Sequence, residues 1–269
     1  MATVGCIIVS YNNLPFLEQA ITSALTQTLP FDEIVIADDG SSDGSRDLIQ
    51  AYASGHQVIK SVLREKNMGV AANRGFAVRS CSCELITTLD GDDFFFKDKN
   101  EKEYEAINNN KDIAFSKITM ISKQGEVVKH MDPFRYQGSD KVHRMTNLIQ
   151  RNKTIPRDML IPKRLYLDSG GFDPDCWQYE DWDFKIRLAA ASDRWINTGI
   201  FGMAYRQTDF GISTKSPLKH FLGQAAVLFK NYKTVIKHTG LQTYAGAFLI
   251  NLSRYFQSEK GRLKRSLIK

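Results

Sequence analysis

Three carboxylates follow a predicted buried strand and stand close enough in sequence to share one ligand. The apolar and β-branched run Leu85–Leu89 is typical of a buried strand, and Asp90, Asp92 and Asp93 come directly after it. Mutual repulsion makes such a cluster costly to keep ionised. A hard divalent cation such as Mg2+ or Mn2+ removes that cost, because it prefers oxygen ligands and often shares them with a substrate phosphate. The alternative is a solvated turn, since Asp and Gly form turns.

Three other predicted strands also end in polar residues. The strands Val4–Ser10, Phe31–Ala37 and Val58–Leu63 alternate with helical patterns near 14–25, 46–53 and 70–80. This alternation predicts an α/β architecture, a mostly parallel, Rossmann-like sheet flanked by helices. Ligands of such sheets bind beyond the carboxyl ends of the strands. Four polar segments are therefore expected to converge on one crevice: Ser10–Asn12, Asp38–Gly40, Arg64–Gly69 and Asp90–Asp93. Neither a G-x-G-x-x-G nor a P-loop sequence is present.

The second half of the chain is less regular. We expect a helix near 99–109, an apolar segment at 113–121 followed by a hairpin turn at 124–125, and a polar, substrate-facing region at 130–157 with one helix near 142–151. A second acidic cluster stands among aromatic residues, as Glu180, Asp181 and Asp183 beside Trp177, Tyr179 and Trp182. A strand near 195–205 is expected to return Arg206 toward the crevice.

From Pro217 the composition changes. Apolar residues recur at helical spacing over 218–236 and again over 241–255, and we interpret these as packing faces rather than membrane-surface faces. Residues 254–269 hold six cations and one anion, so this tail carries +5 of the net charge of +6. The tail predicts peripheral contact with an anionic membrane, and a solvated end is the alternative. No nucleic-acid-binding motif stands in the body, so no nucleic-acid partner is expected.

Cysteine usage and hydropathy favour a cytoplasmic location. The four cysteines include no C-x-x-C pair and suit a reducing compartment. The N-terminus lacks the pattern of a secretory signal. No run approaches the roughly 20 apolar residues of a spanning helix. We therefore predict a cytoplasmic protein whose basic tail contacts the cytoplasmic face of the membrane.

Six short motifs, in this order, resemble the family 2 glycosyltransferases of GT-A fold. The resemblance covers about residues 3–213 and rests on these segments: Ile8–Asn12, Ile36–Ser41, Asn67–Gly69 with Asn73–Gly75, Leu89–Asp93, Gly170–Asp173 and Glu180–Asp183. Each segment alone is weak evidence, whereas the ordered set is strong. The resemblance implies a GT-A domain at 1–213, with a nucleotide-sugar donor half at 1–97 and an acceptor half at 98–213. C-terminal helices and the basic tail would follow at 214–269.

The resemblance implies inverting, metal-dependent transfer from a UDP- or dTDP-linked sugar. Carried over by motif, the nucleotide-sugar-binding residues would be Ser10, Tyr11, Asn12, Asp39, Asn67, Gly69, Asn73, Asp90 and Gly91. Asp92, supported by Asp90, would hold Mg2+ or Mn2+ on the diphosphate. Asp181 would be the general base, and Glu180 would hold the site in place. Asp183 is interpreted as a solvated helix residue.

General chemistry supports these roles. A divalent cation neutralises the charge that develops on a diphosphate leaving group, and a carboxylate within hydrogen-bond reach can take the proton of a sugar hydroxyl. Trp177 and Trp182 offer flat faces on which an acceptor sugar could stack, and Arg206 is assigned to the same side. Many relatives place a His at the position of Thr208, beside Asp209. Either Asp209 completes the metal shell, or the metal has only Asp92, diphosphate and water.

These observations predict a glycosyltransferase of surface polysaccharide or glycoconjugate synthesis with a saccharide or lipid-linked acceptor. One alternative is a nucleotidyltransferase that makes a sugar nucleotide, and the lack of a Gly-rich, basic first loop opposes it. Another is a non-catalytic sugar-nucleotide-binding subunit. The set Asp90, Asp92 and Asp181 opposes that alternative, whereas Thr208 leaves it open.

Overall fold

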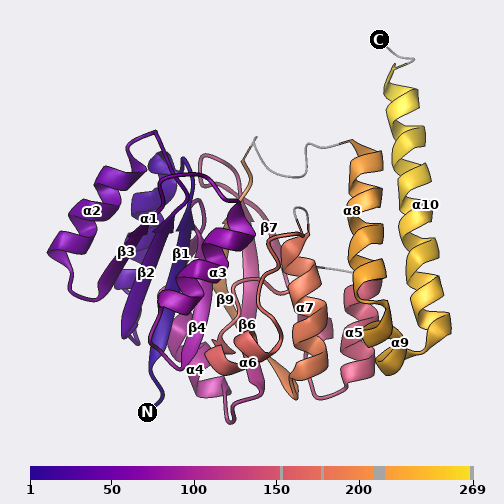
Figure 1. Cartoon of the computed structure of the whole chain (residues 1–269), viewed down its shortest axis with the longest axis horizontal. Helices are drawn as coiled ribbons and strands as arrows, with labels where there is room; N and C mark the ends of the chain where they lie inside the picture. The colour runs from indigo at the N-terminus through magenta and orange to yellow at the C-terminus, as the bar shows by residue number, and fades with distance from the viewer. Residues whose placement is uncertain (152–153, 177–178, 209–215, 267–269) are drawn as a thin grey trace.

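The N-terminal part of the chain forms a mostly parallel sheet, as the sequence predicts. The computed structural model describes residues 1–151, 154–176, 179–208 and 216–266. Within them, one sheet has the order β3-β2-β1-β4-β8, of which the first four strands are parallel and β8 is antiparallel (Figure 1). Its strands are β1 (Val4–Ser10), β2 (Glu33–Asp38), β3 (Ile59–Leu63), β4 (Leu85–Asp90) and β8 (Ile161–Pro162).

Helices connect the parallel strands and cover the sheet. They are α1 (Leu14–Leu25), α2 (Ser45–Gly55) and α3 (Val70–Ser80), each within two residues of its predicted bounds. Pro15 lies in the first turn of α1, where a backbone N–H would have no partner within the helix, so its missing N–H costs no hydrogen bond. β1 and β2 are almost wholly buried, which explains why their sequences are continuous apolar runs rather than alternating ones.

A second sheet extends the fold beyond the parallel strands. Its order is β5-β9-β6-β7, with β6 and β9 parallel and the outer pairs antiparallel. The strands are β5 (Phe94–Phe95), β6 (Asp112–Ile121), β7 (Val127–Met131) and β9 (Arg194–Arg206), and α4 (Lys99–Ala106) and the 3-10 turn η1 (Phe134–Tyr136) accompany them. The predicted hairpin is therefore confirmed as β6 and β7, whereas the mixed pairing of this sheet was not predicted.

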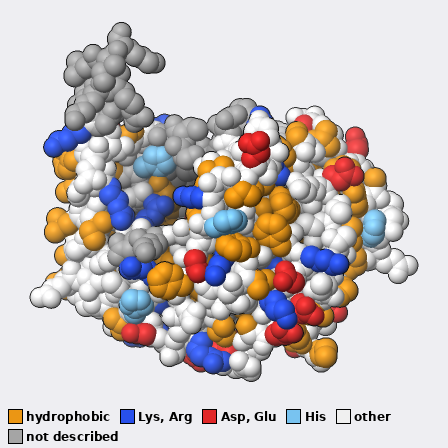
Figure 2. All heavy atoms as spheres, turned by 180° about the vertical axis from the view of Figure 1, so that it is seen from behind, with side chains coloured by type: hydrophobic (Ala, Val, Ile, Leu, Met, Phe, Trp, Pro, Cys, Tyr) orange, Lys and Arg blue, Asp and Glu red, His pale blue; other side chains and the backbone are white. Residues whose placement is uncertain are grey.

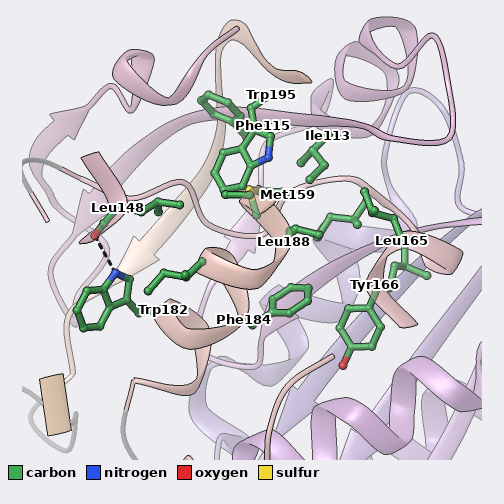
Figure 3. Close-up of a cluster of buried hydrophobic side chains, with 14 of the residues drawn as sticks. Ile113, Phe115, Leu148, Met159, Leu165, Tyr166, Trp182, Phe184, Leu188 and Trp195 are labelled. Carbon is green, nitrogen blue, oxygen red and sulfur yellow. Dashed lines mark hydrogen bonds between the residues drawn. The ribbon is translucent and has the colours of Figure 1, made fainter. Parts of the chain in front are cut away.

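One hydrophobic cluster joins the second sheet to the helices that follow it. The helices are α5 (Lys141–Gln150), α6 (Lys163–Asp168) and α7 (Glu180–Ala191). Figure 3 shows the packed side chains: Ile113, Phe115, Leu148, Met159, Leu165, Tyr166, Trp182, Phe184, Leu188 and Trp195. The indole N–H of Trp182 donates a 2.8 Å hydrogen bond to the carbonyl oxygen of Leu148. That bond satisfies the polar atom of a buried indole.

The C-terminal helices pack against this cluster, as their apolar spacing predicts. They are α8 (Pro217–Lys230), α9 (Tyr232–Thr239) and α10 (Leu241–Ser266) (Figure 1). Val227, Leu228, Val235 and Ala247 are fully buried in the same hydrophobic cluster. Among the residues described, no helix is both long enough and apolar enough to span a bilayer.

The interpretation of Asp183 as a solvated helix residue is wrong. Its side chain is fully buried where α7 meets α8 and α9. The Asp183 carboxylate accepts hydrogen bonds from Lys230 (2.8 Å), Asn231 (2.7 Å) and Arg187 (2.6 Å). Buried charges persist where they are paired and hydrogen-bonded. Here Arg187 lies one turn further along α7, whereas Lys230 and Asn231 lie 47 and 48 residues later in sequence.

Candidate functional site

The carboxyl ends of the parallel strands meet at one edge of the first sheet. Ser10 pairs with Asp38, and Val9 pairs with Asp90, in register. The segments beyond the strands are also joined, because the N–H of Asp39 donates to the carbonyl of Ser10 (3.0 Å) and the N–H of Gly91 donates to that of Val9 (2.9 Å). The predicted convergence of polar strand ends is therefore present in the fold.

Asp39 anchors the loop that precedes α3. It is only 2% exposed, and its carboxylate accepts hydrogen bonds from the backbone N–H groups of Met68 (3.0 Å) and Gly69 (2.8 Å). The structure thus brings together Asp39, Asn67 and Gly69, three residues assigned from sequence to donor binding. Gly69 adopts a φ of +88°, a conformation that side chains rarely tolerate.

The first polar segment divides between turn-forming and exposed residues. Asn12 has a φ of +53°, its N–H donates to Ser41 Oγ (2.8 Å), and its side-chain oxygen accepts from the N–H of Ser42 (2.9 Å). Ser10 is buried, and its hydroxyl has no hydrogen-bond partner among the described residues. Tyr11 is 49% exposed, and Asn12 is exposed as well, so both residues are accessible to a ligand.

Asn73 and Gly91 shape the site from within. Asn73 is buried in α3, and its amide donates a 2.9 Å hydrogen bond to the carbonyl of Ala37 in β2. The structure therefore gives Asn73 a positioning role, and its predicted contact with the donor stays a prediction. A Cβ on Gly91 would lie 3.1 Å from the carbonyl oxygen of Val9, so a side chain there would press these two strand ends apart by a few tenths of an ångström.

Two arginines bind both oxygens of Asp90. Arg74 forms a salt bridge with Oδ1, and Arg157 forms one of 2.9 Å with Oδ2. Burial alone would raise the pKa of Asp90, but the charges of the two guanidinium groups outweigh it and lower that pKa. Asp90 thus fixes the two cations, and its assignment as a supporting metal ligand stays a prediction.

Arg157 is a site residue that the motifs do not reveal. Its guanidinium bridges Asp90 and Asp93, at 2.9 and 3.5 Å, and lies 4.2 Å from the ring centroid of Tyr205. It belongs to the region predicted to face substrate, but no local pattern marks it. The one available signal is a charged pair, Arg157 and Asp158, directly before the apolar segment 159–161. Thr88 donates to the Asp158 carboxylate (2.9 Å).

Asp92 and Asp93 have different surroundings. Asp93 is buried, and its Oδ1 accepts the backbone N–H of Arg206 (2.7 Å), while burial raises its pKa well above the usual range. Burial, followed by the charge of Asp90, raises the pKa of Asp92 to about 6. No salt bridge or side-chain hydrogen bond links the Asp92 carboxylate to another described residue. Asp92 is thus the carboxylate of this cluster that suits a hard cation.

The second acidic motif begins α7 and reaches the same cluster. Asp181 is half-exposed and accepts a 3.1 Å hydrogen bond from Lys185. Burial alone would raise its pKa, but the charges of Lys185 and Arg157 outweigh it and hold the pKa of Asp181 below its usual range. Glu180 is buried 3.9 Å from Arg74, and burial followed by the charge of Asp181 raises its pKa. Both carboxylates occupy the first helical turn, where negative charge is favoured.

Arg74 connects the remaining motifs. Its guanidinium is buried and lies 4.9 Å from the ring centroid of Phe172, which belongs to the Gly170–Asp173 segment. The same arginine contacts Asp90 and Glu180. Three segments that are distant in sequence therefore meet around one cation, which accounts for their common appearance in the motif set.

The acceptor-side assignments need correction. Trp182 is 1% exposed and packs in the hydrophobic cluster, so it offers no face to a sugar. Arg206 is also buried, where it stacks on Phe16 and donates hydrogen bonds to Gln19 (2.7 Å) and the carbonyl of Asp92 (2.9 Å). Its guanidinium braces the Asp92 segment and is not available to an acceptor. Trp177 and Asp209 lie outside the described residues.

Comparisons with known proteins agree with this geometry. The family model described as "Glycosyl transferase family 2" matches residues 6–169. TuaG of Bacillus subtilis, whose name assigns it to teichuronic acid biosynthesis as a glycosyltransferase, is 38% identical over 102 residues, which are 38% of this chain and 40% of that protein. A glycosyltransferase of Methanocaldococcus jannaschii, MJ1057, is 25% identical over 76% of this chain and 70% of its own length.

Solved structures of similar fold include two of TarS from S. aureus. The structure of TarS 1–349 with UDP aligns with a TM-score of 0.69 at 18% identity, covering 95% of this chain and 72% of that one. The structure with UDP-GlcNAc gives a TM-score of 0.71 at 18% identity, with coverage of 95% and 73%. At this identity the likeness concerns the fold, and it confirms the predicted GT-A architecture.

Proposed function

Because the chain belongs to glycosyl transferase family 2, we propose that it transfers a sugar from a nucleotide-sugar donor to a saccharide or lipid-linked acceptor with inversion at the anomeric carbon. One observation carries the proposal. Asp92 and Asp181 come from separate segments, and Arg74 joins these segments through its salt bridges with Asp90 and, at 3.9 Å, with Glu180. A site for a charged donor and a site for proton removal are thus adjacent.

The donor is proposed to be a UDP- or dTDP-linked sugar. Its nucleoside would lie along the ends of β1 and β2, where Tyr11 is exposed and Asp39 holds the 67–69 loop. The carboxylate oxygens of Asp39 retain lone pairs that could accept from the N–H of a pyrimidine base. The structures of TarS in complex with UDP and with UDP-GlcNAc support a uridine nucleotide.

Asp92 would hold Mg2+ or Mn2+ on the diphosphate of the donor. Its oxygen chemistry fits either ion, and its raised pKa reflects the charge repulsion and burial that a bound cation would relieve. When bound, the ion would supply a Lewis acid that neutralises the leaving diphosphate. Arg206 would keep the segment in place through its hydrogen bond to the Asp92 carbonyl, and Arg157 would add positive charge beside the diphosphate.

Asp181 would act as the general base. The acceptor hydroxyl oxygen would form a bond to the anomeric carbon, the bond from that carbon to the diphosphate would break, and the hydroxyl proton would pass to Asp181. A single displacement of this kind inverts the anomeric carbon. Asp181 is ionised at neutral pH because its pKa is lowered, and Glu180 beside Arg74 would hold the start of α7 in position.

The biological setting is proposed to be the assembly of a cell-surface polysaccharide. The similarity to TuaG, whose name refers to teichuronic acid biosynthesis, supports this setting. The matched region is less than half of TuaG, so the acceptor and the linkage of TuaG are not carried over to this chain.

Release of nucleoside diphosphate from a panel of sugar nucleotides, with and without Mn2+, tests this function. We expect one UDP- or dTDP-sugar to give metal-dependent release and Asp92→Ala to abolish it. Release of pyrophosphate from a nucleoside triphosphate and a sugar phosphate would instead show a nucleotidyltransferase. Binding of a sugar nucleotide without any turnover would show a non-catalytic subunit.

A further inference from the structure

The C-terminal helices carry a second apolar face that is exposed to solvent. Six side chains on α8 and α10 are between 48% and 75% exposed, and we call them the outer apolar face: Leu218, Leu222, Phe229, Leu241, Leu249 and Phe256. They recur at helical spacing, as do the buried residues on the opposite side of each helix. The prediction that these helices present packing faces is therefore correct for one side of each helix only.

The exposed residues of both helices lie on the same side of the molecule. Phe221 of α8 contacts Phe248 and Tyr255 of α10, with ring centroids 6.1 and 5.4 Å apart, so these rings mark the seam between the helices. The helices lie side by side and run in opposite directions (Figure 1). Leu222 follows Phe221, and Leu249 follows Phe248, so each leucine is rotated by about 100° around its helix from the seam. Because the two helices are antiparallel, both rotations lead to the same side of the helix pair. The exposed residues of α8 and of α10 therefore form one surface.

The surrounding charge is strongly positive. Residues 217–269 contain ten Lys and Arg residues and one acidic residue, a net charge of +9. The total of +6 therefore leaves residues 1–216 with a net charge of −3. Several of the cations are exposed on the described helices: Lys219, Lys233, Lys237, Arg254 and Lys260. Lys260 lines the same hollow on α10 as Leu249 and Phe256, so a cation stands directly beside the apolar side chains. Figure 2 shows the molecule from behind the view of Figure 1, and there acidic and basic side chains are mixed over the part of the molecule away from the C-terminal helices.

We propose that the outer apolar face and its cations bind the surface of a bilayer that contains anionic lipid. Helices with apolar side chains on one face and Lys or Arg at its border lie in the plane of the membrane, with the apolar side chains at the level of the headgroups. The cations gain from the negative surface potential of anionic lipid. A second copy of the chain is a poorer occupant, because it would bring the same net charge of +9 to the contact.

This surface lies outside the proposed donor site, so the inference goes beyond the proposed function and does not depend on it. Binding to vesicles requires no turnover. It can be measured with Asp181→Asn, a variant that lacks the proposed base, and failure of either hypothesis leaves the other open to test.

Co-sedimentation of the full chain with vesicles tests the inference. We expect at least about tenfold tighter binding to vesicles of phosphatidylcholine with phosphatidylglycerol than to phosphatidylcholine alone, and weaker binding as salt is raised. The double variant L249S/F256S should lower the affinity for anionic vesicles at least about tenfold. The control V127S/V128S removes similar exposed side chains from β7 and should bind like the wild type. Melting temperatures establish that both variants are folded.

Three outcomes would overturn the inference. The first is equal binding to anionic and neutral vesicles, or none to either. The second is binding that L249S/F256S and V127S/V128S change alike. The third is a concentration-dependent dimer in analytical ultracentrifugation that L249S/F256S abolishes, which would identify a second copy as the occupant of this surface.

Discussion

Two clusters of carboxylates and cations in this molecule use the same side-chain chemistry in different ways. The strand-end cluster comprises Asp90, Asp92, Asp93, Arg74 and Arg157, and the junction cluster comprises Asp173, Asp183, Arg187, Lys230 and Asn231. In the junction cluster both oxygens of Asp183 are hydrogen-bonded, Oδ1 to Asn231 and Oδ2 to Lys230 and Arg187. Such a cluster is complete without a ligand.

The strand-end cluster is incomplete in comparison. Within the part of the chain that the structure describes, three of its buried atoms have no hydrogen-bond partner: Asp93 Oδ2 and the Nε atoms of Arg74 and Arg157. An unpartnered buried polar group costs about 1–3 kcal/mol, and that cost is repaid when a ligand supplies the partner. The two clusters therefore differ in completeness. The carboxylate of Asp183 has its hydrogen bonds, whereas the strand-end cluster retains buried charged groups that a ligand could still bind.

The largest expected effect concerns the proposed base beside the strand-end cluster. Asp181→Asn removes the proton acceptor and should lower the transfer rate about 10²- to 10⁴-fold, while UDP affinity stays within about twofold of the wild type, because general-base catalysis contributes to the rate and not to donor binding. Nucleoside diphosphate release and calorimetric titration measure the two quantities. Asp168→Asn, at an exposed position on α6, serves as the control. Near-normal transfer by Asp181→Asn would refute the assignment.

The junction cluster should respond in stability and not in chemistry. Asp183→Asn leaves Lys230 and Arg187 without their buried counter-ion, and the free energy of unfolding should fall by about 3 kcal/mol. At a temperature where the variant stays folded, its transfer rate should match the wild type. Chemical denaturation and the release assay measure both. A large loss of rate in the folded variant would mean that the junction takes part in the reaction.

Arg157→Gln tests the strand-end cluster itself, because the guanidinium of Arg157 lies between two of its carboxylates. The free energy of unfolding should fall by about 2 kcal/mol, less than at the junction because Arg157 is partly exposed. Added Mn2+ should then raise the melting temperature of this variant more than that of the wild type or of Asp183→Asn, since the ion can replace the lost positive charge. Equal shifts in all three proteins would mean that the ion does not replace the charge of the lost guanidinium.

The smallest effect is expected at the rim of the junction cluster. A hydrogen bond from Lys230 lowers the pKa of Asp173, so this carboxylate contributes stability above its unfolded pKa and loses it as the pH falls through the folded value. Asp173→Asn should therefore destabilise the protein by less than about 1 kcal/mol at pH 7, since the pair is partly exposed. The difference from the wild type should vanish in strongly acidic buffer. Thermal melts at several pH values measure it, and a constant difference would exclude this ion pair as the cause.

The sequence predicts the meeting of the polar strand ends well because the information for it is local. Asp39, Gly69 and Asp92 each follow a strand or precede a helix that is evident from apolar spacing, and parallel strands must bring their carboxyl ends to one edge. The salt bridges are different. Arg157 stands 67 residues from Asp90, and nothing near it in sequence announces the contact.

The acceptor side was predicted less well because neighbours in sequence can face opposite ways on a helix. Trp182 follows Asp181 by one residue, a turn of about 100°, and therefore points into the core while Asp181 stays half-exposed. The spacing of Trp182, Ile186 and Ala189, all buried, carries that signal in the sequence. Asp183 differs again, since its partners lie on α8 and directly after it, beyond the reach of any local pattern.

Arg206 also has a consequence for how the protein reaches its native state. Its backbone N–H binds Asp93, 113 residues earlier, and its side chain binds Gln19 and the backbone of the Asp92 and Lys123 segments. The loop that carries Asp92 is therefore held by the last residue of the last strand. During synthesis the Asp92 segment emerges early but gains these braces only after β9 has been made. Closing so long a loop is slow, so this edge of the first sheet should reach its final form among the last events of folding.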